Sequence, residues 1–107
     1  MGISTHILDT ALGRPAKGVA VTLLLESTGA WREVARGVTD ADGRVKPLLE
    51  ALTVAGAYRI VFDTGSYLGE TAFFPCVQIE FRVSAVTEHY HVPLLLSPFG
   101  YSTYRGS

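Results

Sequence analysis

One stretch alternates apolar and polar side chains without a break, and it indicates the fold class: Val77-Gln78-Ile79-Glu80-Phe81-Arg82-Val83. A period of two places successive side chains on opposite faces of a β-strand, so this stretch predicts a strand with one buried face. The same period recurs at residues 19–26 and 58–63, and more weakly at residues 31–38. Such alternation is typical of antiparallel sheets that bury one face.

Turn signals separate the predicted strands. Ser27-Thr28-Gly29 predicts a hairpin between the two strands that flank it, and Gly43, at the end of a polar loop, is free to take a positive φ. With further signals at residues 13–18 and 97–100, the chain divides into about seven or eight short strands. We therefore expect an all-β fold, a two-sheet antiparallel sandwich of the immunoglobulin-like kind.

A single helical segment, at residues 65–71, is expected among these strands. The long helices of an alternating β-α fold are absent from the pattern. The 107 residues contain no internal repeat, low-complexity tract or linker. We therefore expect one domain over residues 1–107.

Composition narrows the classes of function. Hydrophobic residues make up 48% of the chain, which excludes wholesale disorder, and a formal net charge of −1 gives no electrostatic footprint for nucleic acid or an anionic membrane. The single cysteine, Cys76, excludes an internal disulfide framework and a multi-thiolate metal site. No segment approaches the ~20 apolar residues of a membrane span, and the N-terminus lacks a secretory signal. We expect a cytoplasmic protein without nucleic-acid or membrane partners.

Residues 89–97 place two histidines on one face of a predicted strand. The even positions of this stretch are apolar and should point into the sandwich, so His89 and His91 should point outward. Pro93 cannot donate a backbone hydrogen bond to a neighbouring strand. It therefore predicts a sheet edge or a bulge at that point.

The first predicted strand behaves in the same way. If Ile3 and Ile7 point inward, His6 points outward, as His91 does. An isolated surface histidine usually has no special role, but this chain has only three histidines, and two of them, His6 and His91, could converge. Such faces, which mix apolar and titratable groups, suit a second subunit and a site between subunits.

The remaining candidates each have a plain structural interpretation. Arg44 follows the Asp42-Gly43 turn and is either a solvated turn residue or a clamp for an anion or a carbonyl. Asp40 and Asp42 form only a fragment of a calcium loop, so a simple turn is favoured. No acidic residue lies at a convincing ligand spacing from the histidines, which disfavours zinc catalysis. A serine-hydrolase elbow and a phosphate-binding loop are also missing from the sequence.

Three blocks of the chain, taken together, resemble one known family. They are residues 5–16 (THILDTALGRPA), residues 39–44 (TDADGR), and residues 89–98 (HYHVPLLLSP) followed by residues 101–107 (YSTYRGS). In this order they are similar to the transthyretin-like proteins, and within that family to the 5-hydroxyisourate hydrolases of purine breakdown. The terminal block is highly specific, and the resemblance covers the whole chain.

The resemblance implies a fold, an assembly and a reaction. The fold is the transthyretin sandwich of two four-stranded sheets with one short helix. The assembly is a homotetramer, a dimer of dimers, with active sites in a central channel lined by outer sheet faces. The reaction is the hydrolysis of 5-hydroxyisourate to 2-oxo-4-hydroxy-4-carboxy-5-ureidoimidazoline, without a metal or an organic cofactor.

The resemblance also assigns residues to the site. The catalytic positions are His6, Arg44, His91 and Ser107, and the substrate-binding positions are His6, Arg44, Tyr104 and Arg105. One of the two catalytic histidines would activate water, and the sequence leaves open which. Arg44 would hold a carbonyl or anionic edge of the substrate and stabilise the developing oxyanion. The role of His89 stays open.

Two other functions remain as alternatives. The first is a small-molecule carrier of the transthyretin type, which binds without turnover. That branch lacks this set of histidines and the Tyr-Arg-Gly-Ser ending, so their presence here disfavours it. The second is an adhesive immunoglobulin-like module, which would be a monomer and would need no convergence of histidines.

Overall fold

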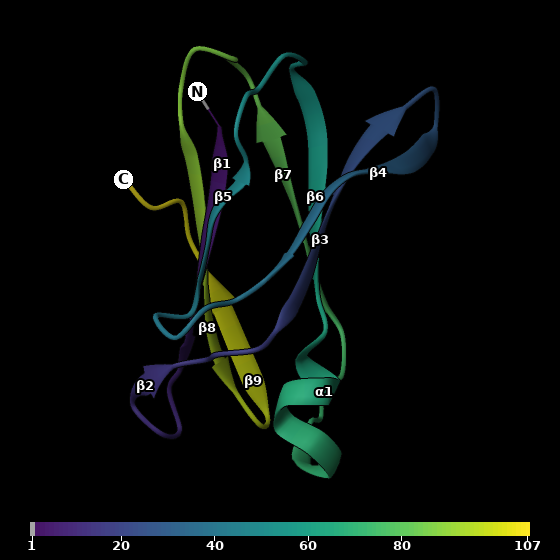
Figure 1. The fold of residues 1–107 in the computed structure, drawn as a ribbon. Coiled ribbons are helices and arrows are strands. Elements are labelled where there is room, and N and C mark those ends of the chain that lie inside the picture. Colours follow the sequence, from purple (N-terminus) through teal and green to yellow (C-terminus); the bar gives the residue numbers. More distant parts are fainter. Residues whose placement is uncertain (1) are drawn as a thin grey trace.

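Two β-sheets lie face to face in the computed structural model, which describes residues 2–107 (Figure 1). The first sheet contains β1 (Ile3–Asp9), β2 (Arg14–Pro15), β5 (Arg44–Leu49), β8 (Tyr90–Ser97) and β9 (Gly100–Thr103). The second contains β3 (Ala20–Ser27), β4 (Ala30–Val38), β6 (Gly56–Phe62) and β7 (Val77–Val83). The predicted all-β, two-sheet sandwich is confirmed.

The order of strands differs in two details from the expected pair of four-stranded sheets. The first sheet has five strands, in the order β2-β1-β8-β9, because β5 pairs with β1 as well. β1 and β8 are also parallel, from Ile3 opposite Tyr90 to Asp9 opposite Leu96. A parallel pair needs a long connection, and the strands between β1 and β8 supply it. All other strand pairs are antiparallel within the described residues.

The local signals for turns and for the helix are largely confirmed. β3 and β4 form the predicted hairpin, whose tip residues Thr28 and Gly29 have φ angles of 53° and 82°. The helical segment is α1 (Thr64–Leu68), extended by the 3-10 turn η1 (Gly69–Thr71). β6 ends before Asp63 because the carboxylate of that residue caps α1, accepting a hydrogen bond from the backbone N–H of Ser66 at 3.2 Å.

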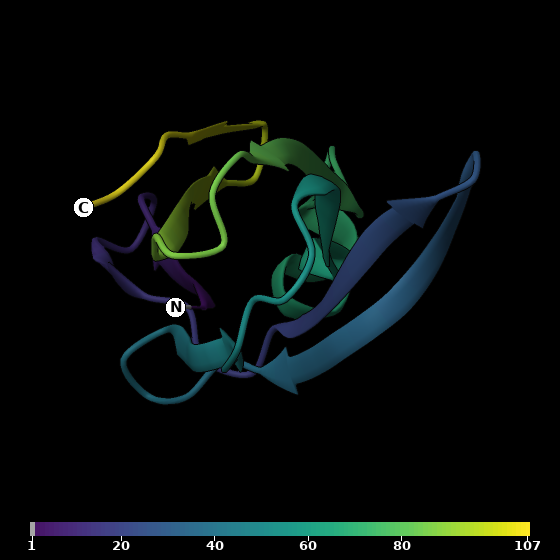
Figure 2. The same cartoon turned by 90° about the horizontal axis from the view of Figure 1, so that it is seen from above.

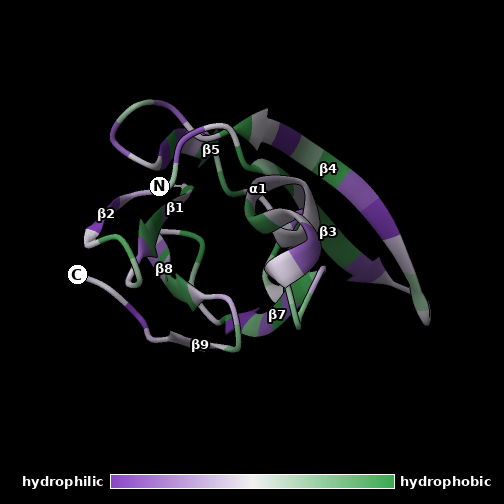
Figure 3. Cartoon of the chain, turned by 90° about the horizontal axis from the view of Figure 1, so that it is seen from below, coloured by the Kyte–Doolittle hydropathy of each residue, from purple (hydrophilic) through white to green (hydrophobic). Residues whose placement is uncertain are grey.

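Seen from above, the two sheets face each other across the interior of the sandwich (Figure 2). The core lies between them and is built from the inward positions of the alternating strands. Bands of hydrophilic and hydrophobic residues follow one another along β4 and β7 (Figure 3). In β1, Ile3 and Ile7 are fully buried, as predicted. The inward residues of β8 are buried too: Tyr90, Val92, Leu94 and Leu96. Burial of these faces fixes the register, because a slip of one residue would expose every apolar side chain.

Pro93 does not lie on an edge strand, because β8 has β1 on one side and β9 on the other. The β8–β9 ladder ends at the pair Leu94 and Thr103, and a single bridge then joins His91 to Gly106. Pro93 falls in the gap between these pairings, so its missing N–H leaves no break in a regular ladder. The bridge also holds the C-terminal segment beside β8.

None of the helices in residues 2–107 has the length and apolar character needed to cross a membrane.

Candidate active site

The outer face of the first sheet brings the predicted histidines and arginine together. In register, His6 of β1 lies between Arg44 of β5 and Pro93 of β8. One row along, Ser4 lies opposite His91. Side chains opposite each other in a ladder share one face, so the cluster follows directly from the pairing of three strands. Both histidines are half-buried, as expected for residues that point away from the core.

The polar loop before β5 fixes the position of Arg44 at the start of that strand. Asp40 accepts hydrogen bonds at one carboxylate oxygen from the backbone N–H groups of Asp42, at 2.8 Å, and Arg44, at 3.0 Å. Gly43 has a φ of 73°, and a Cβ there would lie 2.4 Å from the carbonyl oxygen of Ile7. Only glycine fits this turn, which is the simple turn favoured by the sequence. Its function is to deliver Arg44 to the face that carries His6.

A hollow of about 270 Å³ opens on this face. Its lining comes from β1, β5, β8 with the residue that precedes it, and the chain end: Ser4, Arg44, Lys46, His89, His91 and Ser107. The structure thus gathers three of the predicted catalytic residues around one space, with the fourth, His6, in the neighbouring row. Two of the lining residues are cations at neutral pH, so the hollow suits a ligand rich in carbonyl or anionic oxygens.

Ser4 is the central hydrogen-bonding group of the hollow. Its hydroxyl oxygen lies 2.7 Å from Nδ1 of His91 and 2.8 Å from Nε2 of His89. The residue is only 3% exposed, so its position is fixed by the surrounding strands. Neither Ser4 nor Lys46 was predicted from the sequence. The available signal was the period of two, because they lie two residues from His6 and Arg44 on the same strand faces.

His91 has the electrostatic environment of a neutral base. Burial lowers the pKa of its imidazole below the ordinary 6.5, and the nearby charges of Arg44, His6, His89 and Lys46 lower it further. Within residues 2–107, its Nε2 atom makes no hydrogen bond, whereas Nδ1 is engaged by Ser4. A neutral ring with one free nitrogen can accept a proton near neutral pH.

The C-terminal segment fixes the other side of the His91 ring. The backbone N–H of Gly106 donates to the carbonyl oxygen of His91 at 2.8 Å. A Cβ on Gly106 would lie 2.6 Å from Cδ2 of His91. The segment therefore approaches the imidazole so closely that only glycine fits, and this approach places Ser107 in the hollow.

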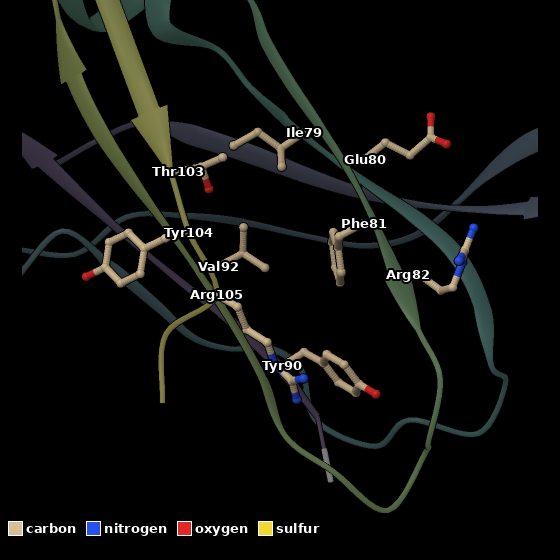
Figure 4. Close-up of a pocket in the computed structure, with 9 residues that line it drawn as sticks. All are labelled: Ile79, Glu80, Phe81, Arg82, Tyr90, Val92, Thr103, Tyr104 and Arg105. Carbon is tan, nitrogen blue, oxygen red and sulfur yellow. The ribbon is translucent and has the colours of Figure 1, made fainter.

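Tyr104 and Arg105 lie elsewhere in a single chain. They line a separate cleft of about 250 Å³ between β7 and the C-terminal segment (Figure 4). The Arg105 guanidinium lies 4.4 Å from the centre of the Tyr90 ring and pairs with Glu88 at 2.9 Å. One chain alone therefore does not bring these two predicted substrate-binding residues to Arg44 and His91.

The fold and the cluster define a class: a β-sandwich with a polar, histidine-containing site on the outer face of one sheet. The family model described as "HIUase/Transthyretin family" matches residues 3–106, and the chain belongs to this family. The resemblance seen in the sequence is thereby confirmed.

Individual relatives include both branches of the family. Over 109 residues the chain is 49% identical to the 5-hydroxyisourate hydrolase of Salmonella dublin, covering 98% of this chain and 80% of that protein. It is similar to the solved structure of Klebsiella pneumoniae 5-hydroxyisourate hydrolase, at 39% identity and a TM-score of 0.86 over 100% of both chains. It is also similar to sea bream transthyretin in complex with thyroxine, at 36% identity and a TM-score of 0.91 over 99% and 95%. The backbone alone therefore does not separate the two branches.

Proposed function

We propose that this protein is a hydrolase that opens the ring amide of 5-hydroxyisourate to give 2-oxo-4-hydroxy-4-carboxy-5-ureidoimidazoline in the breakdown of urate. The observation that carries the proposal is the half-buried His91, whose pKa is lowered by burial and by nearby charges, beside Arg44 in a polar hollow. The relative at 49% identity that is named a 5-hydroxyisourate hydrolase supports the choice of substrate.

His91 is the general base in this proposal. Its free Nε2 takes a proton from a water molecule, and the resulting hydroxide adds to the ring carbonyl of the substrate. The tetrahedral intermediate then collapses, the carbon–nitrogen bond breaks, and the leaving nitrogen takes a proton from the imidazolium. His6 lies one row away on the same face and helps to orient the water or the leaving group. Every step is an addition, an elimination or a proton transfer, so the proposed reaction needs no cofactor.

Arg44 stabilises the oxyanion that forms during the addition. Its guanidinium offers a rigid fork of donors that fits planar oxygen acceptors. Lys46 lies on the same wall of the hollow and adds a second positive charge. Ser107 closes the hollow on the side of the chain end and contributes a hydroxyl near the reacting atoms.

We propose that the protein assembles as a homotetramer, a dimer of dimers, in the cytoplasm. β7 and β9 end their respective sheets, so the outer backbone groups of each are free to pair with a second copy. The cleft that contains Tyr104 and Arg105 lies beside β7 (Figure 4). Their contribution to substrate binding then depends on contact between subunits. The cytoplasmic location rests on the single cysteine, Cys76, which is free.

The alternative is a carrier of the transthyretin type, favoured by the TM-score of 0.91 against sea bream transthyretin. The lining of the hollow argues for the hydrolase instead. Within residues 2–107, its lining side chains are hydroxyl-bearing, cationic or imidazole groups, and none is a large apolar side chain. A pocket built to hold an apolar ligand without reaction is normally lined by hydrophobic and aromatic groups.

The function is tested by an ultraviolet time course. Urate oxidase generates 5-hydroxyisourate in the cuvette, and the purified protein is added as wild type or as Arg44→Ala. We expect the wild type to accelerate loss of the absorbance of the intermediate and the variant to lose most of this effect. Decay at the rate of the buffer control, with correctly folded wild-type protein, would sink the proposal.

A further inference from the structure

The hydroxyl of Ser4 joins two histidine rings with a single proton. It lies 2.7 Å from Nδ1 of His91 and 2.8 Å from Nε2 of His89, both distances typical of strong hydrogen bonds. A hydroxyl can donate one hydrogen bond and accept others. When both rings are neutral, the Ser4 proton therefore points to one ring, and the other ring donates to the Ser4 oxygen.

The direction of this chain determines which nitrogen of His91 carries the proton. If Ser4 donates to His91, the imidazole proton lies on Nε2, and this nitrogen cannot act as a base. If Ser4 donates to His89, Nδ1–H of His91 donates to Ser4 and the lone pair of Nε2 is free. The second arrangement suits the proposed reaction, because the free nitrogen is the one without a protein partner in residues 2–107.

We propose that Ser4 and His89 are positioning residues for His91, and that they form a hydrogen-bond chain that fixes its tautomer and moves its positive charge toward solvent during the reaction. The inference rests on the proposed hydrolysis and deepens it. Ser4 is the fixed link, since it is buried on a central strand, and His89 is the exposed end of the chain.

The same chain can take up the positive charge that the reaction places on His91. When Nε2 of His91 accepts a proton from water, the proton on Nδ1 passes to the Ser4 oxygen as the Ser4 proton passes to Nε2 of His89. His91 is then neutral and the charge lies on His89. When Nε2 gives its proton to the leaving nitrogen, these transfers reverse and the Nδ1–H tautomer is restored. The carboxylic acid that hydrolysis produces, with an ordinary pKa of about 3.5, ionises directly to solvent.

The charges around the chain favour this direction. His91 faces Arg44 and Lys46 from β5 and His6 from β1, and all of these oppose a lasting positive charge on its ring. His89 is exposed to water, and the neighbouring guanidinium of Arg105, 3.5 Å from the His89 carbonyl oxygen, is paired with Glu88 at 2.9 Å. The positive charge is therefore moved away from the cationic wall of the hollow toward water.

The tautomer is measured directly by nitrogen NMR of protein labelled with ¹⁵N-histidine. We expect neutral His91 to carry its proton on Nδ1 in the wild type. In Ser4→Ala the balance shifts toward Nε2–H, and in Ser4→Thr, which keeps the hydroxyl, the wild-type tautomer returns. Ser27→Ala, at the exposed end of β3, is the matched control for loss of a hydroxyl. A His91 tautomer unchanged in Ser4→Ala would overturn the proposal.

Kinetics on the same variants test the catalytic consequence. We expect Ser4→Ala to lower kcat by about 10- to 100-fold with KM almost unchanged, because a poorly oriented base loses much of the rate it normally contributes. Ser4→Thr should recover most of kcat. His89→Ala should lower kcat less, and imidazole added to the buffer should restore part of it by accepting the proton. Wild-type kcat in both Ser4→Ala and His89→Ala would contradict the inference.

Failure of the proposed function and failure of the positioning role give different results. If the wild type hydrolyses no 5-hydroxyisourate, the proposed function fails, while the NMR experiment still decides whether Ser4 sets the tautomer of His91. If Ser4→Ala and Ser4→Thr lose kcat equally together with their circular dichroism spectra, Ser4 is needed only for folding and the positioning role is wrong.

Discussion

Gly106 gives the sharpest test of the geometry around His91. A Cβ added to this glycine would lie 2.6 Å from Cδ2 and 3.3 Å from Cγ of the imidazole. Favourable carbon–carbon contacts begin near 3.5 Å, so Gly106→Ala forces a displacement of about 1 Å. The imidazole is held by Ser4 on its other side, at 2.7 Å. Either the ring moves, or the terminal segment lifts and breaks its 2.8 Å backbone bond to His91.

Both responses should damage catalysis more than stability. A misplacement of about 1 Å in a catalytic group can reduce the rate by about 10²-fold. We therefore expect Gly106→Ala to lower kcat/KM for 5-hydroxyisourate by about 100-fold. The melting temperature should change little, because the residue lies outside the hydrophobic core.

The matched control is Gly100→Ala, in the same C-terminal region. A Cβ there would meet nothing closer than the Ser97 hydroxyl oxygen at 3.8 Å, an ordinary contact. Its activity should stay within about twofold of the wild type. The ultraviolet assay and a thermal melt on both variants complete the test. A Gly106→Ala protein with wild-type kcat/KM would refute the close approach of the terminal segment to His91.

Four further predictions follow from the site and from the proposed assembly. Arg44→Ala should lower kcat by about 10²–10³-fold while leaving the circular dichroism spectrum unchanged, because it removes an oxyanion donor; a loss under threefold would contradict that role. The kcat/KM profile should fall on the acid side below pH 6.5, since the pKa of His91 is lowered and only the neutral ring is a base. Lys46→Met removes one of the charges that lower the pKa of His91, so the acid limb should move to higher pH. An acid limb that stays in place or moves to lower pH would exclude electrostatic coupling between Lys46 and His91. Light scattering should give about four times the chain mass of 11.5 kDa, whereas a monomer would rule out the proposed assembly.

The strands could be predicted from the sequence because their signal is local. The alternation in Val77–Val83 coincides with β7, and burial of Ile3 and Ile7 turns His6 outward as expected. The pairings between distant strands could not be derived from such patterns. The parallel alignment of β1 with β8 is an example, since nothing local to either strand specifies its partner.

The site was predictable in part for the same reason. His6 and His91 could be assigned to an outer face from periodicity, and the resemblance supplied Arg44. Ser4 was missed because its importance depends on register: it matters only because β8 places His91 opposite it. The positions of Tyr104 and Arg105 depend on how the chain leaves β9, which no local pattern specifies.

The most direct measurement of whether this site catalyses hydrolysis is turnover at a protein concentration far below that of the substrate. The wild type and His91→Ala would be added in trace amounts to 5-hydroxyisourate generated in the cuvette, and the loss of its absorbance followed. We expect the wild type to consume many equivalents per chain and His91→Ala to lose at least about 10²-fold in rate. Consumption of no more than one equivalent per chain, or equal rates for both proteins, would contradict a hydrolase built on His91.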